Sequence, residues 1–380
     1  MSVKLVIEED LNYICDQLDD VKENLKGKTI LITGGAGFVG YYLVKTIINL
    51  NYSYKEIDKI NLIITDVFYN GVPKWITKLA ELKNVDIIKH DVIDKFSEKK
   101  FKNINYIVHA ASIASPIYYR KYPIQTMDSN VIGLRNLLDF TIKNNEVKNK
   151  IESILFFSTS EIYGNPSNKF IPTNETYNGN VSCTGPRACY DESKRYGETM
   201  CVNFFKEYNV PIKIVRPFNN YGPGLKITDG RLIPDFANNI FQNKNITIFS
   251  NGSPTRTFCY IADAIVGYIK VLINGRNGES YNIGNDKPEI SVVDLAKIIT
   301  KIANELFLYN KKIIYKVNED PDYLVDNPQR RCPDIRKASD ELNFKPLISI
   351  ENGIRKSLLW YSKNLKEINE WKYLLLAQDM

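Results

Sequence analysis

The chain has 380 residues, of which 44% are hydrophobic and 25% are charged, which is enough apolar material to bury a large core in two lobes. Its net charge of +6 comes from interleaved acidic and basic residues without a basic stripe, which argues against a nucleic-acid partner. No apolar run reaches the roughly 18 residues of a membrane span, and the six scattered cysteines lack disulfide-framework or metal-site spacing, so we expect reduced thiols, no membrane association and no metal.

The first predicted element is an amphipathic helix at residues 8–25. Apolar side chains recur there near helical spacing, from Leu11 and Ile14 to Leu25, with acidic residues between them. The start of the chain lacks the basic and apolar regions of a secretory signal, so we expect a cytoplasmic protein. Residues 1–26 are therefore assigned to an N-terminal helical extension that docks on the main domain.

Short apolar runs alternate with helical stretches from Lys28 onward. Near-continuous apolar runs are typical of strands buried on both faces, and the helices between them imply right-handed crossovers in a parallel sheet. The predicted fold class is α/β, with a Rossmann-like doubly wound sheet. The runs read "TILIT", "NLIITD", "VDIIKHD", "YIVHAA", "SILFFST" and "IKIVRP".

The chain becomes richer in loops after residue 217, which indicates a smaller α/β lobe that completes a cleft. A strand is expected at "SYNIGN", and helices are expected at 231–243, 262–273, 291–306 and 350–363. The expected domains are a cofactor-binding domain at 27–217, to which segments near 250–275 return, a mainly substrate-binding lobe at 218–363, and a C-terminal tail at 364–380.

The run "TILITGGAGFVGYYLVKTI" places three glycines between a predicted strand and a predicted helix. The spacing of Gly34, Gly37 and Gly40 is G-x-x-G-x-x-G, and glycine lets the backbone turn tightly and approach a pyrophosphate at the helix N-terminus. This strand–loop–helix context is that of a dinucleotide site. Asp66 ends the second strand, where an acidic residue binds the adenosine ribose, which favours NAD over NADP. Candidate contacts to the adenine edge follow the third strand at Asp91 and Val92.

Tyr190 and Lys194, in "CYDESKR", stand four positions apart and would share one face of a helix. Tyrosine is a poor base at neutral pH, but a nearby ammonium and an oxidised nicotinamide would both favour its phenolate. Taken alone, a chance pair of helical neighbours is the better interpretation, because the chain has 24 tyrosines and many lysines. The strand "SILFFSTSEIYG" upstream ends in Thr159, Ser160 and Glu161, at the sheet edge where ligands bind. The chain order of glycine loop, hydroxyl-bearing strand end and Y-x-x-x-K pair favours an acid/base couple for a sugar hydroxyl.

From about Lys28 to residue 362 the chain resembles the extended short-chain dehydrogenase/reductases, in the nucleotide-sugar-modifying epimerase/dehydratase branch. The motifs that support this resemblance are "GGAGFVG", "HAASIASP", "STSEIYGNP", "GPRACYDESKRYGETMC", "DGRLIPDF", "GSPTRTFCYIAD" and "DNPQRRCPDI". Together they are most similar to the UDP-glucuronate decarboxylases, which form UDP-xylose. The resemblance implies an NAD-dependent enzyme with a nucleotide-sugar substrate, and a homodimer that uses two helices from each subunit.

The resemblance also implies roles for single residues. Tyr190 would take the proton of the sugar 4-hydroxyl while hydride passes from C4 to NAD, and Lys194 would hold the ribose and lower the pKa of the tyrosine. The 4-ketone lies β to the carboxylate, so carbon dioxide can leave before the hydride returns. Glu161, with Thr159 and Ser160, would orient the ring and assist proton transfer.

The remaining expected contacts are to phosphate, carboxylate and cofactor. Arginine binds phosphate or carboxylate with a bidentate fork, so Arg256 would hold the substrate carboxylate or diphosphate, or protonate C5 after decarboxylation. The expected substrate-binding residues are Arg187, Asn219, Arg231, Arg256 and Arg331. The expected cofactor-binding residues are Gly34, Gly37, Phe38, Val39, Gly40, Asp66, Asp91, Val92, Ala110, Ala111, Ser112, Ser129, Tyr190, Lys194 and Asn220.

Three other functions remain open. A nucleotide-sugar 4,6-dehydratase of the GDP-mannose type shares the T-S-E strand end, whereas Ser160 argues against the dTDP-glucose type. A 4-epimerase is disfavoured by Glu161, and a non-catalytic NAD-binding protein is disfavoured by the intact Tyr190–Lys194 pair. The segment 315–331, "YKVNEDPDYLVDNPQRR", is longer than in the decarboxylases. We therefore expect this chain to differ from the decarboxylases in its substrate pocket.

Overall fold

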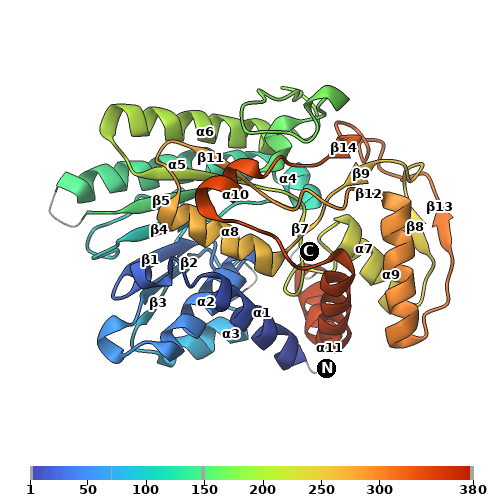
Figure 1. Ribbon diagram of the computed structural model, residues 1–380, viewed down its shortest axis with the longest axis horizontal. Helices are drawn as coiled ribbons and strands as arrows, with labels where there is room; N and C mark the ends of the chain where they lie inside the picture. Colours follow the sequence, from blue (N-terminus) through green and yellow to red (C-terminus); the bar gives the residue numbers. More distant parts are fainter. Residues whose placement is uncertain (1–2, 70, 147–149, 377–380) are drawn as a thin grey trace.

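The computed structural model describes residues 3–69, 71–146 and 150–376, which fold around one central parallel sheet (Figure 1). The strand order is β11-β6-β5-β4-β1-β2-β3. This order confirms the predicted doubly wound α/β class, and the strand expected at "SYNIGN" is β11. The seven strands are β1 Thr29–Thr33, β2 Asn61–Asp66, β3 Val85–Lys89, β4 Tyr106–His109, β5 Ser153–Phe157, β6 Ile212–Pro217 and β11 Ser280–Ile283.

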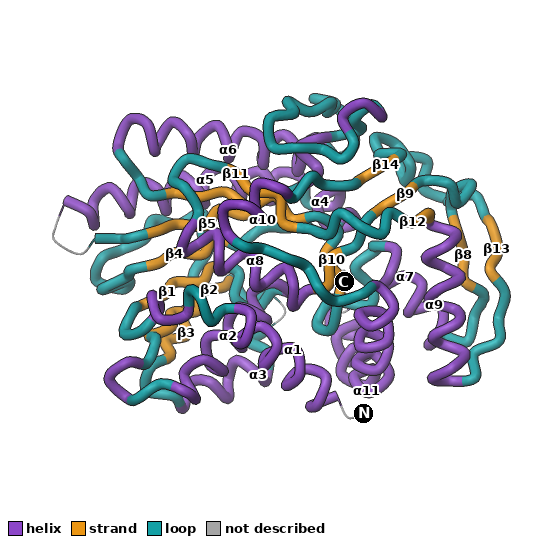
Figure 2. The backbone as a smooth tube through the Cα atoms, viewed as in Figure 1, coloured by secondary structure: helices purple, strands orange, loops and turns teal. Residues whose placement is uncertain are grey.

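Helices cover both faces of the sheet (Figure 2). Successive side chains of a strand point to opposite faces. Ile30 and Ile32 of β1 accordingly join the apolar cluster under α2 (Phe38–Ser53) and α8 (Ile261–Asn274). Leu31 joins the second cluster, under the helices of the other face, which are α5 Pro123–Glu146 and α6 Ala188–Tyr208.

The N-terminal helix α1 spans Val3–Gln17, which corrects the single helix predicted at 8–25. The chain turns after Gln17 and forms a 3-10 helix, η1, at Lys22–Leu25. Leu18 and Leu25 remain buried in spite of the turn. The apolar periodicity therefore identified the buried residues correctly but did not reveal the break between two helices.

Most of the chain after residue 217 lies beyond one end of the sheet, on the right of Figure 1, but α8, β11 and α10 (Arg336–Leu342) lie at the sheet itself. Helices there begin and end close to the predicted ranges, except that α11 continues from Ile350 to Leu376. Three small sheets accompany the helices. Their strands are β7 Asn220–Tyr221 with β10 Cys259–Tyr260, β8 Ile246–Ile248 with β13 Ile313–Tyr315, and β9 Thr255–Arg256 between β12 Ile290–Ser291 and β14 Arg330–Arg331. The remaining helices are α7 Leu232–Phe241 and α9 Val292–Phe307.

Short helices lie within the loops that join the main elements. They are α3 Lys74–Thr77, α4 Pro116–Lys121, η2 Glu56–Asp58, η3 Lys78–Glu81, η4 Ser160–Tyr163 and η5 Asn168–Phe170.

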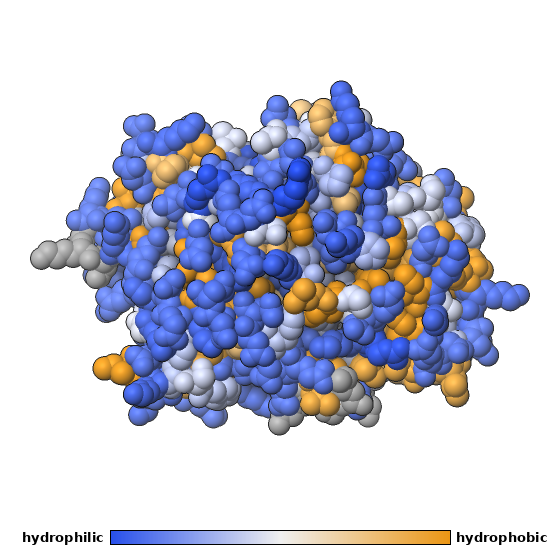
Figure 3. Space-filling view, in the orientation of Figure 1, coloured by the Kyte–Doolittle hydropathy of each residue, from blue (hydrophilic) through white to orange (hydrophobic). Residues whose placement is uncertain are grey.

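Hydrophilic side chains cover most of the face drawn in Figure 3. Within the described ranges, no helix is both long and apolar enough to cross a membrane.

Candidate active site

The candidate site lies where β1, β4 and β5 end. These strands pair in parallel register, with Thr33 opposite His109 and His109 opposite Phe156. Their carboxyl ends therefore lie along one edge of the sheet, which is the edge where doubly wound folds bind ligands. The glycine loop, the loop after β4 and η4 all start from this edge.

The glycine loop fits a pyrophosphate. Gly34 has a φ of 70°, and a Cβ on it would lie 2.7 Å from the backbone nitrogen of Ala111. A Cβ on Gly40 would lie 2.7 Å from the Cα of Gly35, so the loop also packs directly on α2. Gly37 is the N-cap of α2, and no side chain caps that end. The first N–H groups of the helix are thus available to an anion.

Asp66 borders this loop at the end of β2. Its Oδ2 accepts a hydrogen bond from the backbone N–H of Ala36 at 3.1 Å, and its Oδ1 accepts one from that of Phe68 at 2.9 Å. Burial raises the pKa of Asp66, and the two N–H donors oppose that shift. The carboxylate therefore lies beside the glycine loop, where we expect the residue that binds the adenosine ribose. This role of Asp66 stays a prediction.

The other predicted cofactor residues are more dispersed. Ser112, after β4, donates its hydroxyl to Asn130 on α5 at 2.7 Å. The hydroxyl of Ser129 is occupied by the carbonyl of Thr126 at 3.0 Å. Asn220 on β7 has a buried Oδ1 without a hydrogen-bond partner among the described residues. Asp91 and Val92 follow His90 after β3, at the far edge of the sheet. Ala110 and Ala111 directly follow β4, and Phe38 and Val39 begin α2.

Tyr190 and Lys194 lie one turn apart on α6, next to the end of β5. The Lys194 ammonium donates to the carbonyl of Phe157 at 2.8 Å and lies 5.9 Å from the centre of the Tyr190 ring. The Tyr190 ring stacks on that of Tyr119, with centroids 5.0 Å apart and planes 8° from parallel. Both side chains of the pair are buried. The phenol and the ammonium are therefore fixed by packing rather than by solvent-exposed contacts.

Burial opposes the charged form of each partner in this pair. It raises the pKa of Tyr190 to about 12, although a hydrogen bond from the Thr159 side chain acts in the other direction. It lowers the pKa of Lys194 to about 7. Burial, rather than the expected effect of Lys194, therefore dominates the pKa of Tyr190, and the phenol is protonated at neutral pH.

Glu161 lies in η4, directly after β5. The Thr159 hydroxyl accepts from the N–H of Glu161 at 3.2 Å and so caps η4. The Glu161 carboxylate forms ion pairs with Arg187 and, at 3.0 Å, with Arg331. Burial acts to raise the pKa of Glu161, but the charges of these arginines hold it below its ordinary value. Glu161 is therefore an anion that can orient groups and accept hydrogen bonds but has no proton to donate.

Arg331 and Arg256 stand opposite each other in the β14–β9 pair. Arg331 donates to the carbonyl of Ser160 as well as to Glu161. The Arg256 guanidinium donates to the carbonyls of Pro328 at 2.5 Å and Gln329 at 3.2 Å. Burial and the charge of Arg331 lower the pKa of Arg256 to about 10, so it stays charged at neutral pH. The loop before β14 thus holds this predicted active-site arginine.

Two further predicted substrate residues lie close to the loops of this edge. Arg231, the N-cap residue of α7, forms an ion pair with Asp229 at 3.0 Å and donates to the carbonyl of Ala114 at 3.1 Å. Asn219 donates its amide to the carbonyl of Thr257 at 2.8 Å. Arg231 therefore links the loop after β4 to the second lobe.

Sequence reasoning missed two buried groups beside Tyr190. Tyr119 of α4 stacks on it, and Asp191 follows it in the chain with only 4% of its surface exposed. One Asp191 oxygen lies 3.8 Å from Nε of Arg187, and the other has no hydrogen-bond partner in the part of the chain that is described. Burial, and then the charge of Glu161, raise the pKa of Asp191. Adjacent helical residues point in different directions, so no spacing rule selects Asp191.

A depression of about 560 Å³ lies beside the start of α6. Arg120 of α4 forms an ion pair with Asp320 at 2.6 Å on one side of it, which joins α4 to the long segment 315–331. Groups of three or more metal-ligating side chains do not occur within the described ranges. The depression is lined by Ile117, Arg120, Lys121, Pro123, Gly185, Pro186, Cys189, Asp320 and Asp322.

Comparisons with known proteins agree with this geometry. Residues 30–284 match the model of the NAD dependent epimerase/dehydratase family. UDP-glucuronic acid decarboxylase 1 of Xenopus tropicalis is 34% identical over 347 residues, which cover 91% of this chain and 75% of that protein. UDP-glucuronic acid decarboxylase 3 of Arabidopsis thaliana is 34% identical over 325 residues, which cover 86% of each chain.

Solved structures of similar fold include sugar-nucleotide enzymes. An epimerase of Methanothermobacter thermautotrophicus superposes with a TM-score of 0.76 at 26% identity, over 94% of this chain and 97% of that one. A dTDP-glucose 4,6-dehydratase of Bacillus anthracis, solved with NAD, gives a TM-score of 0.72 at 25% identity, over 91% of this chain and 99% of that one. An epimerase and a dehydratase thus share one framework with this chain, and the fold alone does not choose between reactions.

Proposed function

The chain belongs to the NAD dependent epimerase/dehydratase family, and we propose that it converts UDP-glucuronate to UDP-xylose and carbon dioxide in an NAD-dependent reaction. The observation that supports this most is the 34% sequence identity between this chain and UDP-glucuronic acid decarboxylases over 91% of its length. The buried Tyr190–Lys194 pair beside the end of β5 is consistent with the proposal.

The reaction has no net gain or loss of hydride, and it adds one proton to C5. NAD, when bound, supplies the acceptor of the C4 hydride and gives the hydride back after carbon dioxide has left. We assign to Tyr190 the removal of the 4-hydroxyl proton and its return. The C5–carboxylate bond can break because the C4 carbonyl group takes up its electron pair. Carbon C5 then takes a proton in place of the lost carboxylate.

The arginines and Glu161 would bind and orient the substrate. We assign to Arg256 the binding of the substrate carboxylate or diphosphate. Burial lowers the pKa of Arg256 only to about 10, so the guanidinium is charged at neutral pH. Arg231 and Asn219 would contact the sugar nucleotide from the second lobe. Arg187 and Arg331 keep Glu161 ionised, so in our proposal Glu161 accepts hydrogen bonds from sugar hydroxyls and the proton for C5 comes from another group.

The domain roles, the assembly and the location are also proposals. We assign NAD to residues 27–217 together with α8, and the sugar nucleotide mainly to residues 218–363. A homodimer through α5 and α6 is supported by partly exposed apolar side chains there, including Ile132 and Tyr196. A cytoplasmic location is supported by six cysteines that are all free thiols.

Product analysis tests the reaction. The purified protein is incubated separately with UDP-glucuronate, GDP-mannose, UDP-glucose and dTDP-glucose, and the products are identified by mass. We expect loss of carbon dioxide from UDP-glucuronate only. Loss of water from a hexose donor would instead mean a dehydratase, and inversion without a change of mass would mean an epimerase. No turnover of any donor by protein that contains NAD would leave a non-catalytic NAD-binding protein.

Gly40→Ala is expected to weaken NAD binding by at least about tenfold, which corresponds to about 1.4 kcal/mol. The added Cβ would lie 2.7 Å from the Cα of Gly35, so the loop must move away from α2. Calorimetric titration with NAD measures the effect. The control is Tyr52→Ala, at the other end of α2, where the side chain is 81% exposed and should not matter. Unchanged NAD affinity in Gly40→Ala would refute this account of the loop.

A further inference from the structure

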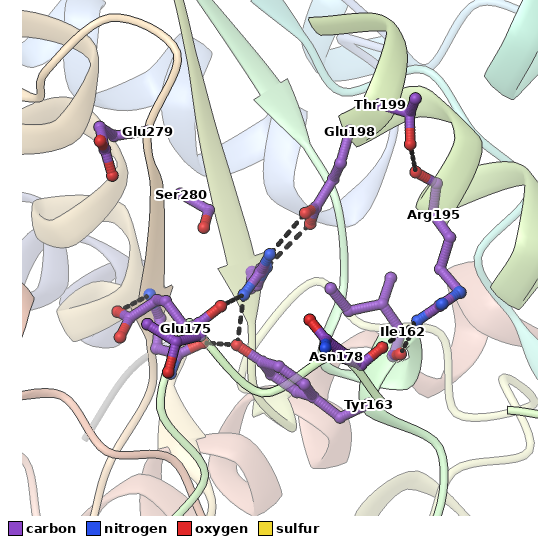
Figure 4. Close-up of polar contacts among 12 residues, drawn as sticks. Ile162, Tyr163, Glu175, Asn178, Arg195, Glu198, Thr199, Glu279 and Ser280 are labelled. Carbon is purple, nitrogen blue, oxygen red and sulfur yellow. Dashed lines mark hydrogen bonds and ion pairs between the residues drawn. The ribbon is translucent and has the colours of Figure 1, made fainter. Parts of the chain in front are cut away.

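Arg216 on β6 joins the two elements that bear the candidate catalytic side chains. Its Nε and Nη2 donate to the two carboxylate oxygens of Glu198, on α6, at 2.9 and 2.5 Å. Its Nη1 donates to the hydroxyl of Tyr163, in η4, at 2.7 Å. Figure 4 shows Glu198 and Tyr163 on opposite sides of the guanidinium that the dashed lines connect to both. One side chain thus bridges α6 and η4.

The positions of the two partners make this bridge relevant to the site. Glu198 follows Lys194 by one helical turn and Tyr190 by two, so the three share one face of α6. Tyr163 follows Glu161 by two residues in η4. A shift of η4 relative to α6 would therefore change the separation between the phenol of Tyr190 and the strand-end groups.

The bridge is buried and its hydrogen bonds are paired. Arg216 is 8% exposed and Tyr163 is 1% exposed. The Tyr163 hydroxyl accepts from Arg216 and donates to Asn282 of β11 at 2.8 Å, and the guanidinium also lies 5.1 Å from the centre of the Tyr163 ring. A bidentate arginine–carboxylate pair fixes orientation as well as distance. The contacts leave this bridge little freedom to rearrange.

None of these contacts involves a group that we assign to chemistry or to substrate. We propose that Arg216, together with Glu198 and Tyr163, is a positioning residue that holds Tyr190 at its working distance from Thr159 and Glu161. This inference rests on the proposed function. Misplacement of a reacting group by about 1 Å can cost about 10²-fold in rate, so a loosened bridge should lower kcat more than it changes KM.

Removal of the bridging hydroxyl in Tyr163→Phe is the sharpest test. The Thr159 side chain lowers the pKa of Tyr190 through a hydrogen bond, and a displaced η4 would weaken that bond and raise the pKa. Other groups that face the phenol are Glu161 of η4, Asp191 and Lys194 of α6, Tyr119 of α4, Arg231 of α7 and Tyr268 of α8. We expect kcat to fall about 10- to 100-fold, with little change in KM, and the acidic limb of the kcat–pH profile to move to higher pH.

A matched control separates positioning from general loss of stability. Tyr309→Phe also removes the hydroxyl of a buried tyrosine, which donates to the carbonyl of Lys244 at 2.6 Å in the second lobe. We expect Tyr309→Phe to keep the wild-type kcat–pH profile even if its unfolding temperature is lower. Equal kinetic losses in both variants, or a wild-type profile in Tyr163→Phe, would overturn the proposal.

A second measurement does not need turnover. Ultraviolet titration of the wild type minus Tyr190→Phe gives the ionisation of Tyr190, and the same difference is measured in the Tyr163→Phe background. A higher pKa of Tyr190 in that background supports the bridge even if UDP-glucuronate is not the substrate, and an unchanged pKa contradicts the bridge even if it is.

Discussion

Tyr190→Phe is expected to lower kcat for the release of carbon dioxide from UDP-glucuronate by about 10²- to 10⁴-fold, the usual contribution of a positioned acid or base. The variant removes only the hydroxyl. Its ring should keep the stack on Tyr119 at 5.0 Å, so the fold and the substrate pocket should stay unchanged. The loss should therefore appear in kcat, with the NAD content and the unfolding temperature close to those of the wild type.

The acid/base role also predicts how the wild-type rate depends on pH. Burial raises the pKa of Tyr190 to about 12, so the reactive phenolate is scarce at neutral pH and its fraction grows as pH rises. The rate should therefore rise with pH along an acidic limb, and Tyr190→Phe should remove that limb. Tyr196→Phe is the matched control, because Tyr196 lies on the same helix with 54% of its surface exposed. Retention of full activity by Tyr190→Phe would mean that another group is the base.

Local spacing allowed the central parts of this site to be predicted from sequence. The glycine loop and the Tyr190–Lys194 pair depend on residues close together in the chain, so a strand, a tight turn or one helical turn is enough to place them. The apolar runs likewise predicted six strands of the central sheet, whereas the seventh, β11, was expected as a strand of the smaller lobe. What these patterns could not supply was the environment, because burial, rather than Lys194, dominates the pKa of Tyr190.

The arginines show where spacing stops being informative. Arg256 and Arg331 are far apart in sequence and become neighbours only through the β9–β14 pairing, a two-residue ladder with no periodicity to detect. That pairing brings Arg331 to Glu161 and places Arg256 against the loop before β14. Arg216 was missed for a related reason. It belongs to an ordinary buried strand, and its partners come from a helix and a short 3-10 turn elsewhere in the chain.

Asp10→Ala is expected to lower the free energy of unfolding by about 3–5 kcal/mol, the usual cost of removing one partner of a buried ion pair. Asp10 of α1 is fully buried and accepts hydrogen bonds from the hydroxyls of Tyr42 at 2.9 Å and Tyr260 at 2.7 Å. It also accepts one from the ammonium of Lys356, on α11, at 2.7 Å. Alanine would leave three donors without this acceptor and weaken the contacts of α1 with α2 and α11.

Urea unfolding measures the loss, and hydrogen exchange of the α1 amides locates it. The control is Asp19→Ala, since Asp19 pairs with Lys22 on the surface, with 71% of the Asp19 side chain exposed, and should leave stability almost unchanged. The pH dependence gives a second check with Asp10→Asn. Burial raises the pKa of Asp10, so above its ordinary value of 3.8 the folded state keeps a proton that the unfolded state has lost. Stability from this group therefore falls as pH rises towards the folded-state pKa, and Asp10→Asn should flatten that fall. An equal slope in the two proteins, or an Asp10→Ala variant as stable as Asp19→Ala, would show that α1 is not anchored by this carboxylate.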